Sequence, residues 1–95
     1  MRLKTYEIDA IKNSFKSVFN NGQIFLFGSR TDDSKKGGDI DLFIELEDKI
    51  NLFEKKIKFL AKIKKVIGEQ KIDVVFNEDK NRLIEKEARK WAIQL

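Results

Sequence analysis

The chain has 95 residues, of which 41% are hydrophobic and 38% are charged, and its formal net charge at pH 7 is +4. This length and balance indicate one small soluble globular domain rather than a disordered chain or a two-domain protein. The sequence contains no cysteine and no histidine. Their absence excludes disulfides, thiolate or imidazole zinc sites, and catalysis by either side chain, so chemistry must depend on carboxylates, hydroxyls, lysine and arginine.

Neither a targeting segment nor a membrane span is visible in the sequence. Residues 1–6 carry no apolar signal segment, and no stretch approaches the roughly 20 apolar residues of a membrane span. We therefore expect a cytoplasmic protein without a membrane partner. The positive charge comes largely from lysines that alternate with apolar residues over positions 55–65. On a helix they form a basic outer face, and we favour a solvated face over one that binds nucleic acid.

The first half of the chain predicts one helix and two strands. Apolar residues recur at helical spacing over residues 5–20, and the Asn-Gly pair at 21–22 is typical of a helix end. Residues 23–27 are apolar and bounded by glycines, as expected of a buried strand. The polar segment 30–38 predicts a mobile surface loop. Residues 39–46 alternate between polar and apolar, which predicts a strand whose apolar face packs on helices.

The second half predicts a helix, a strand and a last helix. The first of these helices is predicted to begin with Asn51 and Glu54 in a capping arrangement and to end at Gly68. One side of this helix is expected to carry Phe53, Ile57, Leu60, Lys64 and Ile67. The buried arc is expected to be wider and to include Leu52, Phe59, Ile63 and Val66. Residues 71–76 alternate as a strand does, and residues 77–95 predict a helix that reaches the end of the chain.

The predicted order is therefore α-β-β-α-β-α, an α/β (α+β) fold in which helices flank a small mixed sheet. No linker, repeat or low-complexity segment divides the chain, so residues 1–95 are expected to form a single domain. The strand–helix–strand unit over residues 39–76 predicts a right-handed crossover that places its two strands next to each other. This topology brings Asp73 beside Asp41.

Two segments hold the candidate site. Gly28-Ser29 leaves an apolar strand and offers backbone N–H groups, a hydroxyl and no Cβ, which suits a polyphosphate that lies close to the main chain. Asp39 and Asp41, two positions apart on a strand, place their carboxylates on one face, where they can bind hard cations. Taken alone, the first segment could be an ordinary turn and the second a solvated pair. Together with Asp73 they predict a metal–triphosphate site.

This combination of Gly-Ser, a loop, and Asp-x-Asp opening a hydrophobic strand resembles the signature of the DNA polymerase β-type nucleotidyltransferases. The length of the chain resembles their minimal, MNT-type branch. The resemblance implies that Asp39 and Asp41 bind two Mg²⁺ ions. It also implies that Asp73 binds one of these ions and acts as the base that deprotonates the acceptor hydroxyl. ATP or another nucleoside triphosphate would be the substrate.

The same resemblance concerns the three residues that follow the first predicted strand. It assigns Gly28 and Ser29 to binding the outer phosphates of the nucleotide. Arg30 comes next in the sequence, and it either pairs with phosphate or is simply solvated. These assignments follow from matching the residues to the family's motif.

The activity implied by the resemblance is transfer of a nucleoside monophosphate, AMP from ATP, to a hydroxyl. In the minimal branch, the acceptor is a tyrosine of a small helical HEPN-type ribonuclease toxin, and the transferase is the antitoxin of the HEPN/MNT pair. Two alternatives stay open: a catalytically silent antitoxin or binding module that masks its partner, and a catalytic subunit acting on RNA ends or on a small hydroxylated molecule. Retention of all three aspartates favours an enzyme, while the nucleobase and the oligomeric state stay open.

Overall fold

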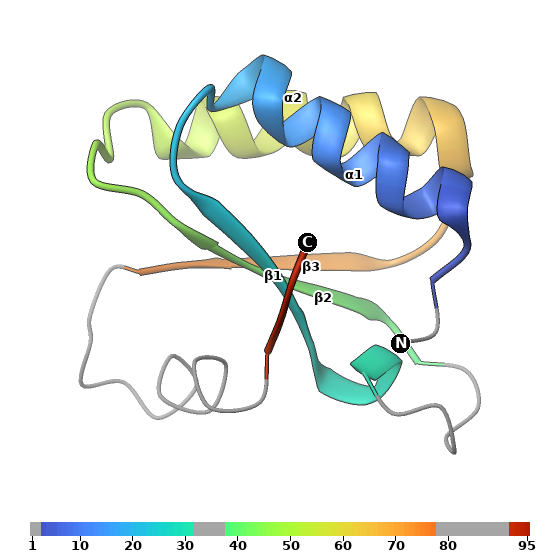
Figure 1. Ribbon diagram of the computed structural model, residues 1–95. Coiled ribbons are helices and arrows are strands. Elements are labelled where there is room, and N and C mark those ends of the chain that lie inside the picture. The colour runs from blue at the N-terminus through green and yellow to red at the C-terminus, as the bar shows by residue number, and fades with distance from the viewer. Residues whose placement is uncertain (1–2, 32–37, 78–91) are drawn as a thin grey trace.

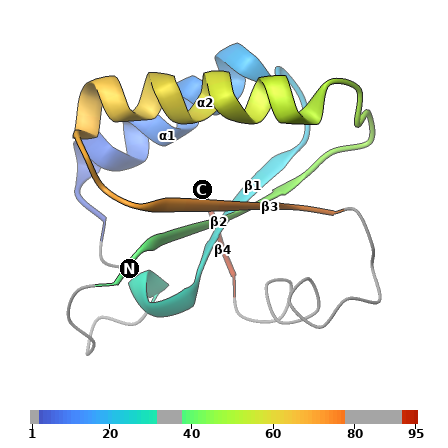
Figure 2. The ribbon, with the colours of Figure 1, turned by 180° about the vertical axis from the view of Figure 1, so that it is seen from behind.

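The computed structural model describes residues 3–31, 38–77 and 92–95 of the chain. Within them, the helices α1 (Thr5–Val18) and α2 (Leu52–Ile67) lie on the same face of a sheet, as Figures 1 and 2 show from opposite sides. This arrangement confirms the predicted fold class. Neither helix of the described part is long and apolar enough to cross a membrane.

The described strands form one mixed sheet in the order β3-β2-β1-β4. β1 (Gln23–Phe27) pairs antiparallel with β2 (Ile40–Glu45), and β2 pairs parallel with β3 (Ile72–Phe76). Parallel neighbours require a long crossover connection, which α2 supplies here. The strand–helix–strand unit therefore places β2 and β3 side by side, as the sequence predicted.

The C-terminal residues differ from the prediction. The helix expected over residues 77–95 does not extend to the end of the chain, because Ile93 and Gln94 form the short strand β4 (Ile93–Gln94) beside β1. The N–H of Leu95 donates to the carbonyl of Ile24 at 3.0 Å. Pairing with β1 overrides the helical spacing at these positions, since tertiary context outweighs local propensity. Residues 78–91 lie outside the described part of the structure.

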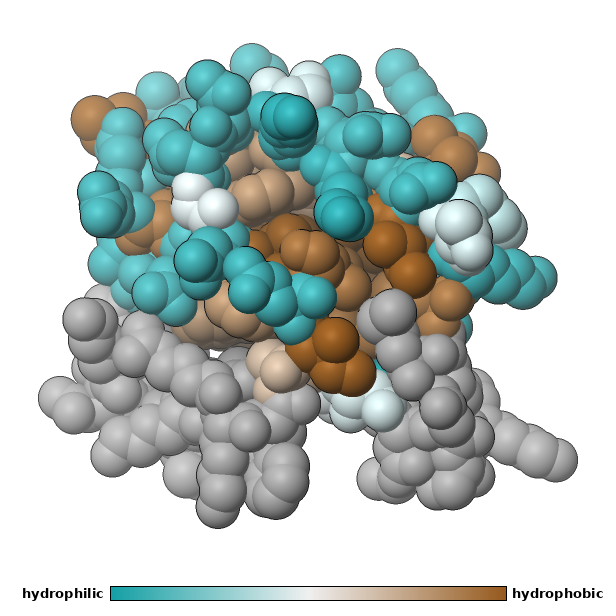
Figure 3. Space-filling view, in the orientation of Figure 1, coloured by the Kyte–Doolittle hydropathy of each residue, from teal (hydrophilic) through white to brown (hydrophobic). Residues whose placement is uncertain are grey.

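The core lies between the helices and the sheet. Alternate residues of β2, Ile40, Leu42 and Ile44, are fully buried in this core, which confirms the predicted apolar face of the strand. Phe59 and Ile63 of α2 are also fully buried. In Figure 3, hydrophilic side chains cover most of the helical layer, and apolar side chains are visible beneath them. This packing holds β2 rigidly in the middle of the molecule.

α2 confirms part of its predicted buried arc, because Phe59, Ile63 and Ile67 are buried and Leu52 and Leu60 pack against the core, but Val66 is exposed. Phe53 and Ile57 are 76% and 52% exposed. Each helical residue advances by about 100°, so Phe53 and Ile57 lie roughly 80° and 120° around the helix from Ile63, the middle of the buried stripe. The prediction for these two residues is therefore wrong.

The helix ends depend on residues in the left-handed region. Asn20 follows α1 with a φ of 62°, in keeping with the predicted Asn-Gly stop just after it. Asn51 precedes α2 with a φ of 58° and makes no side-chain capping bond. A side-chain cap normally requires extended backbone at that position, so the capping arrangement expected for Asn51 and Glu54 is wrong.

Candidate active site

The pairing of β2 with β3 brings together two of the predicted site residues. Asp41 and Asp73 are partners in the parallel register, and strand alternation directs both side chains away from the core. Burial raises the pKa of Asp41, and the negative charges of Asp73 and Asp39 and a hydrogen bond with Asp73 raise it further, while Lys71 opposes them. Two negative carboxylates are therefore unfavourable here unless a cation accompanies them.

Asp39 has a different neighbour. It directly precedes β2 and Lys71 directly precedes β3, so the register that pairs Asp41 with Asp73 also brings Asp39 next to Lys71. Lys71 Nζ lies 3.4 Å from Asp39 Oδ2, and the two side chains are 70% and 43% exposed. Ion pairs this exposed are generally worth about 0–1 kcal/mol, so the Asp39 carboxylate can exchange the lysine for another cation.

In this structure the three aspartates are not arranged as a single metal-binding group. Among residues 3–31, 38–77 and 92–95, no three His, Cys, Asp or Glu side chains are placed to hold a metal ion together. The structure thus brings Asp41 and Asp73 into direct contact and pairs Asp39 with Lys71. The metal-binding roles assigned to the three aspartates stay a prediction.

Gly28 packs against the carboxylate of Asp41. Its φ is +79°, and a Cβ at this position would collide with Asp41 Oδ2. The positive φ turns the chain from β1 into the short 3₁₀ helix η1 (Gly28–Thr31), in which Thr31 Oγ1 donates to the Gly28 carbonyl at 2.7 Å. The predicted phosphate-binding turn and the predicted cation site are therefore neighbours. The side chain of Ser29 lies outside the described part, so its phosphate contact stays a prediction.

Arg30 is held by two other segments of the chain. Its Nε donates to the carbonyl of Gly38 at 3.2 Å, and its Nη2 donates to Oε1 of Gln70 at 3.3 Å. Phosphate binding and plain solvation were the two roles considered from the sequence, and these contacts add a third, structural role. Arg30 and Thr31 belong to η1 rather than to a surface loop, and residues 32–37 of the predicted loop lie outside the described residues.

A hollow of about 420 Å³ opens beside Asp41 and Asp73. Phe27 at the end of β1 and Lys56 on α2 contribute to its lining, together with three further residues of β3: Ile72, Val74 and Val75. β3 is the outermost strand on this side of the described sheet, and Asp73 is exposed there. Lys56 adds a positive charge suited to an anionic substrate.

Neither Lys56 nor Lys71 is among the site residues that the sequence predicted. A signal for Lys71 was present in the strand pattern, because it lies two positions before Asp73 and so on the same face of the chain. Pairing Asp73 with Asp41 then places Lys71 next to Asp39. No comparable signal exists for Lys56, whose place depends on how α2 lies over β3.

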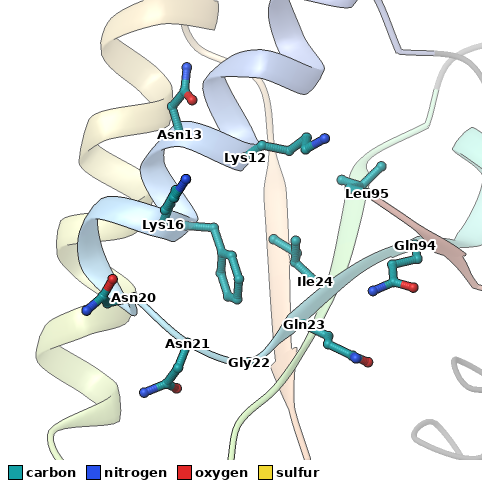
Figure 4. A pocket seen from close by; sticks show the side chains of 11 residues that line it. Lys12, Asn13, Lys16, Asn20, Asn21, Gly22, Gln23, Ile24, Gln94 and Leu95 are labelled. Atoms are coloured by element: carbon teal, nitrogen blue, oxygen red, sulfur yellow. The ribbon is translucent and has the colours of Figure 1, made fainter.

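A second hollow, of about 360 Å³, lies between α1 and the ends of β1 and β4 (Figure 4). It sits at the Gln23 end of β1, whereas Gly28 follows the opposite end. Its described lining includes Lys12 and Lys16 and contains no acidic side chain. A third hollow, lined by Glu45, Glu47 and Asp48, lies at the same end of β1. We place the candidate active site at the hollow beside Asp41, because Asp41, Asp73 and Gly28 meet there.

Comparison with protein-family models identifies a family for this chain. The chain fits the family model described as "Polymerase beta, Nucleotidyltransferase" over residues 9–95, a range that includes every site residue considered above. No curated protein matches the chain at a significant level. The family match covers most of the described helices and strands as well as the candidate site.

Proposed function

The chain belongs to the polymerase β-type nucleotidyltransferase family, and we propose that it transfers a nucleoside monophosphate from a nucleoside triphosphate to a hydroxyl group. The observation that carries this proposal is the register that pairs Asp41 with Asp73, with Gly28 packed against Asp41. This arrangement places carboxylates for a cation beside a backbone turn that a phosphate can approach.

The donor set fits divalent cations. Carboxylate oxygens are the ligands that Mg²⁺ prefers, and the raised pKa of Asp41 reflects negative charge that nearby cations would neutralise. We assign Asp39, Asp41 and Asp73 to hold two Mg²⁺ ions, with Asp39 released from its exposed pair with Lys71. Bound there, the ions would stabilise the attacking and leaving oxygens of an in-line displacement at phosphorus.

The residues of the chain bind the nucleotide and move one proton. Gly28 and Ser29 are assigned to the outer phosphates, and Lys56 supplies positive charge. Asp73 is exposed at the edge of the sheet and accepts the proton of the acceptor hydroxyl. A bond forms between the acceptor oxygen and the α-phosphorus, the bond from the α-phosphorus to its bridging oxygen breaks, and pyrophosphate leaves.

We extend the proposal to the donor and the acceptor. The donor is ATP, and the acceptor is a tyrosine of a small helical HEPN-type toxin, so that the chain acts as an antitoxin in the cytoplasm. The resemblance to the minimal branch of the family supports this assignment. The exposed position of Asp73 on edge strand β3 supports a macromolecular acceptor, because a large partner can reach it.

One observation favours a second candidate function, in which the chain masks its partner by binding alone. Asp39 is paired with Lys71, and the described residues contain no group of three side chains placed to hold a metal. If Asp39 never exchanges Lys71 for a metal ion, the domain would keep its fold but would not transfer nucleotides. Such a protein would still silence a partner by covering it.

The deciding experiment combines labelled ATP, Mg²⁺ and a HEPN-type toxin encoded next to this chain with either the wild type or the Asp73→Asn variant. We expect label on the partner with the wild type and none with Asp73→Asn, while partner binding is retained. Asp9→Asn, which changes an exposed aspartate of α1 in the same way, is the matched control and should label normally. Equal silencing by wild type and Asp73→Asn without added mass on the partner would establish the binding-only function instead.

A further inference from the structure

Glu7 is a buried carboxylate that the proposed chemistry does not use. It lies in the first turn of α1 and is only 4% exposed. Both of its oxygens are occupied: Oε1 accepts from the Lys4 backbone N–H at 2.9 Å, and Oε2 accepts from Gln70 Nε2 at 2.8 Å. A buried carboxylate is costly to keep unless it is hydrogen-bonded, so these contacts are what allow it to stay inside.

Glu7 keeps its negative charge in this position. Burial alone would raise the pKa of Glu7, but the hydrogen bonds from Lys4 and Gln70 and the positive charges of Arg30 and Lys4 outweigh it and lower the pKa. An ionised carboxylate can only accept hydrogen bonds. Glu7 therefore fixes the amide of Gln70 with its NH₂ group toward α1.

The contacts continue from Gln70 to Arg30. With its NH₂ group on Glu7, the amide of Gln70 presents Oε1 to Arg30 Nη2 at 3.3 Å. A guanidinium can only donate, so the amide satisfies both neighbours in just one orientation. Arg30 Nε then donates to the carbonyl of Gly38 at 3.2 Å. We call the contacts from Glu7 through Gln70 and Arg30 to Gly38 the Glu7–Gln70–Arg30 relay.

Two residues of the relay are direct sequence neighbours of the candidate site. Gly38 directly precedes Asp39, and Gln70 directly precedes Lys71, the ion-pair partner of Asp39. The carbonyl of Lys71 also accepts the N–H of Ile40 at 3.0 Å, so the starts of β2 and β3 are joined at this point. The relay thus connects α1, the turn after β1 and the starts of both strands that carry the aspartates.

We propose that the Glu7–Gln70–Arg30 relay is a positioning device that holds Asp39 where a divalent cation can bind. The inference rests on the proposed function, since it concerns the same site. Arg30 acts through Gly38 in this proposal, and its contact with phosphate is not required. Glu7, Gln70 and Arg30 are positioning residues, because the cation would contact only the aspartates.

The test measures the affinity of the protein for Mn²⁺ without nucleotide, by electron paramagnetic resonance. Gln70→Ala removes the link without changing the charge, and we expect it to weaken Mn²⁺ binding roughly tenfold, the lower end of what is usual when a supporting partner of a metal ligand is lost. Gln23→Ala, at an exposed position at the far end of β1, is the matched control and should bind as the wild type does.

Substitutions of Arg30 separate positioning from charge. Removing a positive charge near the aspartates should tighten Mn²⁺ binding by electrostatics alone, whereas loss of the relay should weaken it. We expect Arg30→Gln to weaken Mn²⁺ binding. The Arg30→Gln/Gln70→Ala double variant should bind Mn²⁺ no more weakly than the weaker-binding of the two single variants, because both changes break the same connection. Arg30→Lys keeps the charge without the planar donor fork and should also bind more weakly.

The outcomes of this experiment are distinct. If the wild type does not bind Mn²⁺, the proposed function fails and the relay proposal falls with it. If the wild type binds and Gln70→Ala, Arg30→Gln and Arg30→Lys bind equally well or better, the relay proposal is overturned while the proposed function stands. Thermal melting of each variant identifies any loss of folding. If Gln70→Ala does not fold, the Mn²⁺ affinity of Arg30→Lys decides the test.

Discussion

Asp41 lies directly opposite Asp73 across the parallel pair of strands β2 and β3. The carboxylate of Asp41 also lies against Gly28, so three segments that are far apart in the sequence meet at this one side chain. Because burial and the neighbouring aspartates disfavour its charge, the site carries an electrostatic cost when no cation is bound. Such costs are common where a site is built for a ligand.

The Asp41→Asn variant should bind Mn²⁺ much more weakly than the wild type and yet melt at a higher temperature when divalent ions are absent. The pKa of Asp41 is raised in the folded state, so the folded state holds that proton more tightly and the ionised carboxylate destabilises the fold at neutral pH. Asparagine removes this cost. Melting by circular dichroism checks the prediction, with Asp9→Asn as control, and a lower melting temperature for Asp41→Asn would contradict it.

Gly28→Ala should destabilise the protein more than Gly68→Ala does. Both glycines have positive φ angles, +79° and +82°, so both substitutions place alanine in a strained backbone conformation, at a cost of typically about 1–3 kcal/mol. Only at Gly28 does the added Cβ meet another group, the carboxylate of Asp41, whereas at Gly68 nothing lies within 4 Å. The difference between the two free energies of unfolding, measured in urea, isolates that contact.

Binding gives a second readout for the same pair of glycine variants. Gly28→Ala should also weaken Mn²⁺ binding, because Asp41 must move to accommodate the methyl group. Gly68→Ala should leave Mn²⁺ binding unchanged. Equal stability and equal binding for the two variants would show that Gly28 serves only the turn.

Lys71→Gln should tighten Mn²⁺ binding by a factor of up to about 5, since it removes a competitor for Asp39 whose exposed ion pair is worth about 0–1 kcal/mol. The gain should shrink at high salt, which already screens an exposed pair. Lys62→Gln removes the same charge from an exposed position of α2 and is the control. A Lys71→Gln protein that binds Mn²⁺ more weakly would mean that the lysine supports the site instead of competing for it.

Glu7→Gln should cost stability at neutral pH but less in acid. The folded pKa of Glu7 is lowered from the ordinary value of 4.5, so its contribution is fully present above that value and is lost as the pH falls through the folded pKa. We expect a loss of about 1–3 kcal/mol near pH 7, the usual effect of weakening hydrogen bonds to a buried charged group. Urea unfolding near pH 7 and near pH 3 checks this, and a difference that stays constant with pH would contradict it.

The sequence by itself determined the fold class and the meeting of Asp41 with Asp73. Strand alternation fixed which residues of β2 and β3 face the core, and a strand–helix–strand unit leaves few topologies other than adjacent parallel strands. The Gly-Ser turn beside Asp-x-Asp was visible for the same reason, because β1 and β2 are close in sequence and pair with each other. These are short-period or short-range features, which a sequence displays directly.

Only the tertiary structure decided the partners of the charged and amide side chains. The pairing of Asp39 with Lys71 and the contacts of Arg30 and Gln70 depend on how far long side chains reach between segments distant in the chain. The exposure of Phe53 and Ile57 on α2 and the pairing of β4 with β1 likewise depend on which surfaces meet in the folded molecule. Periodicity cannot predict these features, because it describes each segment alone, whereas each of these contacts is a property of two segments placed together.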